Sequence, residues 1–124
     1  MSNSISVSGV LVREPELRYT RQGQANVLLS LSVDTHWHDA ETGDEVGFFD
    51  VICREDLAEH VALSLTRGSR CMVTGRLHQR NWETELAERR SKIEIVADEV
   101  GASLLHATVE VHRHDRHPAG AGTE

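Results

Sequence analysis

The residues of this chain that could do chemistry are a few aromatic rings and many arginines. The 124 residues include only five Phe, Trp or Tyr residues, and both tryptophans, Trp37 and Trp82, lie in polar stretches without apolar neighbours. Twelve of the 13 basic residues are arginine. A guanidinium group binds phosphate through two hydrogen bonds and stacks on flat rings. Exposed rings beside arginines therefore indicate a surface for a ligand that is both anionic and aromatic.

The aromatic residues leave one alternative open. Trp37 and Trp82 either stack on a ligand or fill a core or an interface. Phe48 and Phe49 are adjacent, so in a strand they point to opposite faces, and we expect one in the core and the other outward.

The net charge of −7 argues against a polyanionic partner when taken alone. The charge is unevenly distributed, however. Residues 22–53 contain six acids and no Lys or Arg, whereas residues 67–92 contain seven bases and three acids. Residues 67–92 are therefore the better candidate for contact with an anion. A solvated surface of mixed charge would, however, have the same numbers of acids and bases.

No motif predicts an enzyme or a metal site. The chain contains no phosphate-binding Gly-rich loop, no HExxH, no G-x-S-x-G and no paired-cysteine zinc pattern. His36 and His38, and His112, His114 and His117, are spaced so that they could hold zinc. We interpret them as solvated histidines in a loop and a tail, and expect no cofactor and no metal.

Most of the chain has the period-2 pattern of strands. We predict strands over residues 4–11, 25–34, 48–53, 70–79 and 91–100, a short extended segment over 17–21, and possible further pairing over 103–111. The residues expected inside are apolar or glycine and alternate along these strands: Ile5, Val7, Gly9, Leu11, Ala25, Val27, Leu29, Leu31, Val33, Cys71, Val73, Gly75, Leu77, Ile93, Ile95 and Ala97. Polar stretches 38–45 and 83–90 are predicted hairpin loops.

One helix is expected between the third and fourth main strands. Asp56 and Glu59 have the spacing of a capping box, and Leu57, Val61 and Leu65 form an apolar stripe. Arg67 and Gly68 are typical of a helix end. The order β-β-β-α-β-β predicts an all-β protein with an OB-fold, a five-stranded Greek-key barrel with one helix between strands 3 and 4.

Other features predict one soluble domain. Residues 1–111 are expected to fold, and residues 112–124 have no apolar periodicity and are expected to be a disordered tail. No apolar run is long enough to cross a membrane, and residues 1–9 lack the features of a secretory signal. Cys53 and Cys71 lie in apolar runs and are expected to be buried thiols in the cytoplasm.

The sequence resembles the bacterial single-stranded DNA-binding protein family over about residues 4–105. The matching pieces are VSGVLVREPELRYT, SLSVDTHWHDAETGD, FFDVICREDLAEHVALSLTRGSR and GRLHQRNWETE. The resemblance implies an OB-fold subunit, usually a homotetramer, that wraps single-stranded DNA without sequence preference in replication, recombination or repair. It also implies a cytoplasmic, nucleoid-associated, non-enzymatic protein with no small-molecule substrate.

The resemblance and the residue types together give a candidate site. Trp37, Phe48 and Trp82 are expected to stack on bases, with Phe48 at the family's stacking position. The expected phosphate-binding or stacking cations are Arg54, Arg76 and Arg80, with Arg18 and Arg89 as weaker candidates.

Three features of the sequence differ from the family pattern, and the first two argue against strong DNA binding. Arg54 stands where the family usually has an aromatic residue, and Asp50 places an acid in the expected site. The tail also lacks the acidic-hydrophobic tip through which the family recruits other proteins. The alternative hypothesis is an OB-fold protein–protein module of a replication or DNA-uptake assembly with weak DNA affinity.

Overall fold

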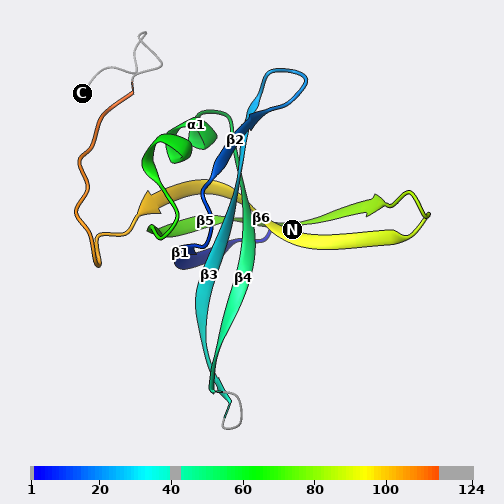
Figure 1. Ribbon diagram of the computed structural model, residues 1–124, viewed down its shortest axis with the longest axis horizontal. Coiled ribbons are helices and arrows are strands. Elements are labelled where there is room, and N and C mark those ends of the chain that lie inside the picture. The colour runs from blue at the N-terminus through cyan, green and yellow to red at the C-terminus, as the bar shows by residue number, and fades with distance from the viewer. Residues whose placement is uncertain (1, 40–42, 115–124) are drawn as a thin grey trace.

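The computed structural model describes residues 2–39 and 43–114, with side chains described for 2–34 and 46–114. It contains six strands and one helix (Figure 1). The strands are β1 (Ile5–Leu11), β2 (Glu16–Tyr19), β3 (Ala25–Asp39), β4 (Gly43–Arg54), β5 (Arg70–Glu83) and β6 (Arg89–Ala102), and the helix is α1 (Glu55–Ser64).

The sheet closes into a barrel. The strand order is β1-β5-β6-β4-β3-β2, and β1 also pairs with β3 through Val10 and Leu11, so five strands form a ring. All pairings are antiparallel except the one between β4 and β6. The predicted OB-fold is confirmed. The extended segment near residues 17–21 forms the short extra strand β2 on β3, so the helix follows the fourth strand of the chain rather than the third.

The period-2 pattern predicts the inner face of the barrel well. Every predicted inward residue of β3 is buried, as are Gly9, Leu11, Cys71, Val73 and Gly75. A Cβ atom on Gly75 would lie 2.1 Å from the backbone oxygen of Val96, so β5 and β6 approach here more closely than a larger residue allows. Leu77 and Ile93 are wrong predictions, because both lie where the strands leave the barrel and are exposed.

Both cysteines are buried and free, as predicted. Burial raises the pKa of Cys53 to about 12, with a smaller contribution from neighbouring Cys71, and raises that of Cys71 to about 11. The thiols are therefore protonated at neutral pH and serve as small core residues.

Two hairpins extend from the barrel in different directions, the β3–β4 hairpin downward and the β5–β6 hairpin to the right in Figure 1. Their strands run further than predicted. β3 reaches Asp39 and β4 starts at Gly43, whereas β5 reaches Glu83 and β6 starts at Arg89. The predicted loops 38–45 and 83–90 are thus partly strand, because the hydrogen bonds of an antiparallel hairpin are made by the backbone and do not require apolar side chains.

The helix forms where expected, but its ends differ. It starts at Glu55 without a side-chain cap, so the prediction of a capping box formed by Asp56 and Glu59 is wrong. It ends at Ser64, and Arg67 lies beyond its last turn. Gly68 has a left-handed φ of 92°, which it uses in the turn before β5 rather than at the helix end.

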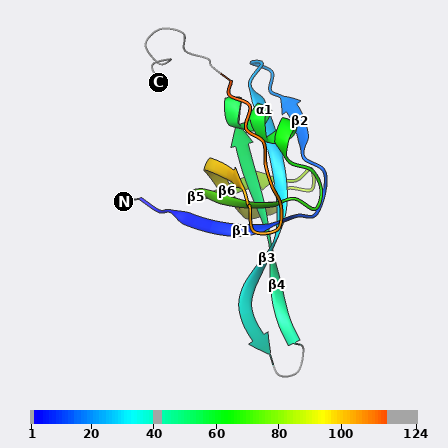
Figure 2. The same ribbon diagram turned by 90° about the vertical axis from the view of Figure 1, so that its left-hand side faces the viewer.

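The segment after β6 forms no strand between residues 103 and 114. The possible pairing of 103–111 is therefore wrong. Ser103 still donates its N–H to the Arg70 oxygen at 3.0 Å, but Leu104, Leu105, Val109 and Val111 are exposed. Figure 2 shows this segment passing beside α1, where the His60 and His114 ring centroids are 4.9 Å apart. The predicted boundary between domain and tail at residues 111/112 stays a prediction.

Candidate functional site

The outer faces of β2, β3, β4, β6 and β5 form one continuous surface. Strand register places the candidate cations on it: Arg18 pairs with Asn26, and Asn26 pairs with Arg54 on its other side. Odd-numbered residues of β3 and β4 point into the barrel, so Arg54, Phe48 and Asp50 point outward together. We call this surface the outer face.

A groove of about 600 Å³ on the outer face collects three of the predicted cations, and we call it the arginine groove. Its lining residues are Asn3, Leu28, Ile52, Arg54, Arg76, Leu77, His78, Arg80, Glu94 and Val96. The lining combines the three arginines with apolar side chains, of which Leu28 is 40% exposed. Such a groove can hold a flat apolar group beside an anion.

A second groove of about 650 Å³ continues from the first, since both share Leu28 and Ile52. Arg13 and Arg18 line it, together with Glu14 and Glu16. Arg18 donates to Glu16 at 2.8 Å, and this hydrogen bond and the arginine charge lower the pKa of Glu16. Arg18 therefore lies next to the arginine groove, but its charge is largely matched.

Most cations of the outer face are paired with carboxylates. Arg76 lies 3.8 Å from Asp98, and Arg80 lies 3.4 Å from Glu94. Lys92 forms an ion pair with Asp50. Among the three arginines of the arginine groove, Arg54 is the one with no carboxylate within ion-pair distance in the described part of the chain, so it is the most available of the three to an added anion.

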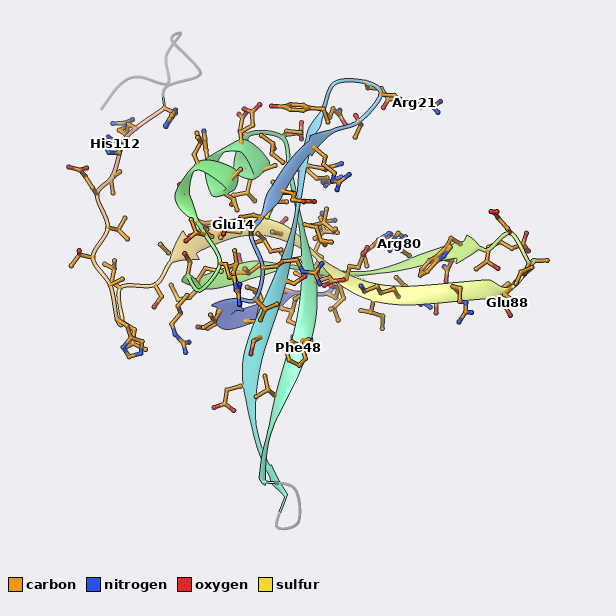
Figure 3. The ribbon with its side chains drawn as sticks, in the orientation of Figure 1. Glu14, Arg21, Phe48, Arg80, Glu88 and His112 are labelled. Atoms are coloured by element: carbon orange, nitrogen blue, oxygen red, sulfur yellow. The ribbon has the colours of Figure 1, made fainter. Side chains whose placement is uncertain are left out.

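Phe48 has the placement expected of a stacking residue. Its side chain is 72% exposed on β4, whereas Phe49 packs half-buried against the core. The prediction that the two rings point to opposite faces is confirmed. Figure 3 shows Phe48 and Arg80 on different hairpins near the point where the hairpins meet the barrel.

Trp82 is not a core residue, because it is 39% exposed and lies far along the β5–β6 hairpin. The guanidinium carbon of Arg80 lies 4.4 Å from the ring centroid, a cation–π contact. Trp82 also lines a third groove, of about 550 Å³, with Asn81, Glu83, Arg89, Arg90 and Ser91. Arg89 is thus near Trp82 but separate from the arginine groove.

The remaining aromatic candidate, Trp37, lies in β3 near the far end of the β3–β4 hairpin, one residue before the pair His38–Asp44. Its side chain lies outside the described residues, as do those of His36 and His38. Its stacking role stays a prediction.

Sequence reasoning missed Lys92 and Glu94. Lys92 pairs with Arg80 across the β5–β6 hairpin, and Glu94 pairs with His78. Counting outward from the predicted loop 83–90 would pair Arg80 with Ile93, one residue out of register, so it could not have found these pairs. Glu94 is only 6% exposed, and nothing in the sequence distinguished it from the exposed polar residues of the same strand.

The described part of the chain contains no group of three His, Cys, Asp or Glu side chains that could hold a metal ion. His112 instead contacts Glu110 at 3.1 Å. Among the same residues, no helix is long and apolar enough to span a membrane.

Comparison with known proteins adds an independent observation. Residues 2–103 match the model of the single-strand binding protein family. The single-stranded DNA-binding protein of Mycobacterium leprae is 39% identical over 91% of this chain and 70% of its own length. That of Mycolicibacterium smegmatis is 40% identical over 91% of this chain and 71% of its length. Single-stranded DNA-binding protein 1 of Tropheryma whipplei is 35% identical over 91% and 63%. With this match over most of its length, the chain belongs to the single-strand binding protein family.

Proposed function

We propose that this protein binds single-stranded DNA without sequence preference. The observation that carries the proposal is the outer face, where Arg54, Arg76 and Arg80 line one groove with apolar residues and where the rings of Phe48 and Trp82 are exposed. Single-strand binding needs cations for the phosphates and flat faces for the unpaired bases. The names of the relatives support the same ligand.

Each candidate residue has a role in this proposal. Phe48 and Trp82 stack on bases, and Trp37 does so from the β3–β4 hairpin. Arg54 binds phosphate or stacks where the family usually has an aromatic ring. Arg76 and Arg80 contribute cations in the groove, and Arg18 and Arg89 extend the charge at its two ends.

No contact that this proposal uses reads the edge of a base. Arginine contacts to phosphate and ring stacking are both insensitive to sequence. The carboxylates of Asp50, Glu94 and Asp98 also lie on the outer face, where they compensate part of its charge. We therefore expect a weaker salt dependence than a fully basic groove would give.

The proposal includes an assembly and a cellular role. The protein forms a homotetramer that binds and protects single strands in replication, recombination or repair, in the cytoplasm with the nucleoid. This is a binding function without a chemical step. The oligomeric state is tested by sedimentation equilibrium, in which a mass of one or two chains would contradict the tetramer.

Titration of the intrinsic tryptophan fluorescence with oligo-dT at two salt concentrations tests the binding function. Stacking on Trp37 or Trp82 should quench the emission, and the midpoint should move to higher DNA concentration as salt rises. No quenching and no change in sedimentation with oligo-dT would contradict the proposal and favour the protein–protein module.

A further inference from the structure

A buried carboxylate lies in the groove that the proposed function assigns to phosphate. Glu94 is 6% exposed, and among the described residues that line the arginine groove it is the only acid. A buried charge is costly unless it has a charged partner. Glu94 has one, because the Nε–H of Arg80 donates to its Oε1 at 3.4 Å.

The same arginine is in contact with an aromatic ring. Its guanidinium carbon lies 4.4 Å from the centroid of Trp82, while the side chain as a whole is 49% exposed. Arg80 therefore contacts both the buried carboxylate of Glu94 and the exposed ring of Trp82. Figure 3 shows Arg80 where the β5–β6 hairpin leaves the barrel.

One side of Trp82 stays accessible in this arrangement. The groove that Trp82 lines with Arg89 and Arg90 does not include Arg80 among its lining residues. A base can thus reach the ring from this groove while Arg80 stays in contact with it. An arginine that is already fixed loses less conformational entropy when the ligand binds.

We infer that Glu94 is a positioning residue for single-stranded DNA, which acts through Arg80 to hold the Trp82 ring in the orientation that accepts a base. The inference rests on the proposed function. It opposes the simple electrostatic expectation: a carboxylate in a phosphate-binding groove repels the ligand, so its removal by charge alone would tighten binding.

The first experiment measures how neutralising Glu94 changes affinity, because the positioning role predicts weaker binding and simple charge repulsion predicts tighter binding. Glu94→Gln keeps the size of the side chain and removes its charge. It should weaken oligo-dT binding by about two- to fivefold, the range that one exposed cation–π contact supports. The matched control is Asp50→Asn, which removes one charge from the same face, next to Lys92, and should leave affinity equal or higher.

A double-mutant cycle shows whether Glu94 acts through Arg80. In an Arg80→Met background, Glu94→Gln should no longer weaken binding. Tighter binding by Glu94→Gln in the wild-type background, as for Asp50→Asn, would overturn the inference. An equal loss with and without Arg80 would overturn it as well.

The second experiment needs no DNA. In a Trp37→Phe background Trp82 is the only tryptophan, and its accessibility is measured by acrylamide quenching. Glu94→Gln and Arg80→Met should both increase quenching, whereas Asp50→Asn should not. Thermal melting checks that each variant is folded. If Glu94→Gln does not fold, Glu94→Asp, which keeps the charge but shortens the side chain by one methylene and so withdraws it from Arg80, must still increase quenching.

These readouts separate the two proposals. Absence of oligo-dT binding by the wild-type protein contradicts the proposed function. Unchanged Trp82 quenching in folded Glu94→Gln overturns the positioning role whether or not DNA binds.

Discussion

The two faces of the same barrel strands differ in what holds their residues in place. Leu29, Leu31 and Val51 point inward and are at most 1% exposed, so burial alone explains them. On the outer face, Asp50 and Lys92 come from different strands and are held by each other. The inner face thus depends on the position of each residue along its strand, whereas the outer face depends on which strands are neighbours. We expect inner substitutions to change stability and outer substitutions to change binding.

The largest effect is expected on the inner face. Leu31→Ala should lower the free energy of unfolding by about 2–5 kcal/mol, because it removes a fully buried side chain and leaves a cavity. Urea unfolding followed by circular dichroism measures the change. The matched control, Leu28→Ala on the outer side of the same strand, should cost much less. Equal losses would show that the two faces of β3 do not differ as described.

The next effect is on the outer face. Trp82→Ala, and likewise Trp37→Ala, should weaken oligo-dT binding by about tenfold or more, since a base–aromatic stack contributes roughly 1–3 kcal/mol. The melting temperature should change little, because Trp82 lies outside the core. Variants that melt early but bind normally once folded would place the tryptophans in a structural role.

A smaller effect is expected from Arg54, the arginine of the arginine groove that has no ion-pair partner among the described residues. Arg54→Gln should weaken binding and reduce the slope of log affinity against log salt by ~0.7, the value for one phosphate contact on a single strand. Affinity measured at four or five salt concentrations gives the slope. Arg76→Gln, whose cation already faces Asp98, is the control and should reduce the slope less. A larger reduction of the slope by Arg76→Gln than by Arg54→Gln would contradict the view that the ion pair with Asp98 limits the contribution of Arg76.

The smallest effect is expected from the tail. Residues 112–124 carry two arginines and two acids and therefore no net charge when histidine is neutral. Their removal should leave both the melting temperature and the affinity at pH 8 nearly unchanged. A large gain in affinity on truncation at pH 8 would show that the tail inhibits binding.

Sequence predicts the inner face better than the outer one for a physical reason. Alternation along one strand identifies Val27, Leu29 and Leu31 as inward residues without knowledge of any neighbour. The pair of Arg80 with Glu94 requires the β5–β6 register, which the polar composition of residues 83–90 obscured. The sequence also identified Arg54, Arg76 and Arg80 as candidates, and the fold brings all three to one groove. The predicted helix cap is wrong because the helix already begins at Glu55, which places Arg54 at the N-cap position and Asp56 inside the first turn.

The central claim is that single-stranded DNA lies along the outer face of β4, β6 and β5. Hydrogen–deuterium exchange with and without oligo-dT tests it most directly. We expect slower exchange on DNA binding around Phe48–Arg54, Arg76–Trp82 and Lys92–Val96. Peptides from β1, which is not part of the outer face, around Ser6–Ser8, should be unaffected by DNA. Protection confined to β1, or to α1, with no change in the first three segments, would contradict the account.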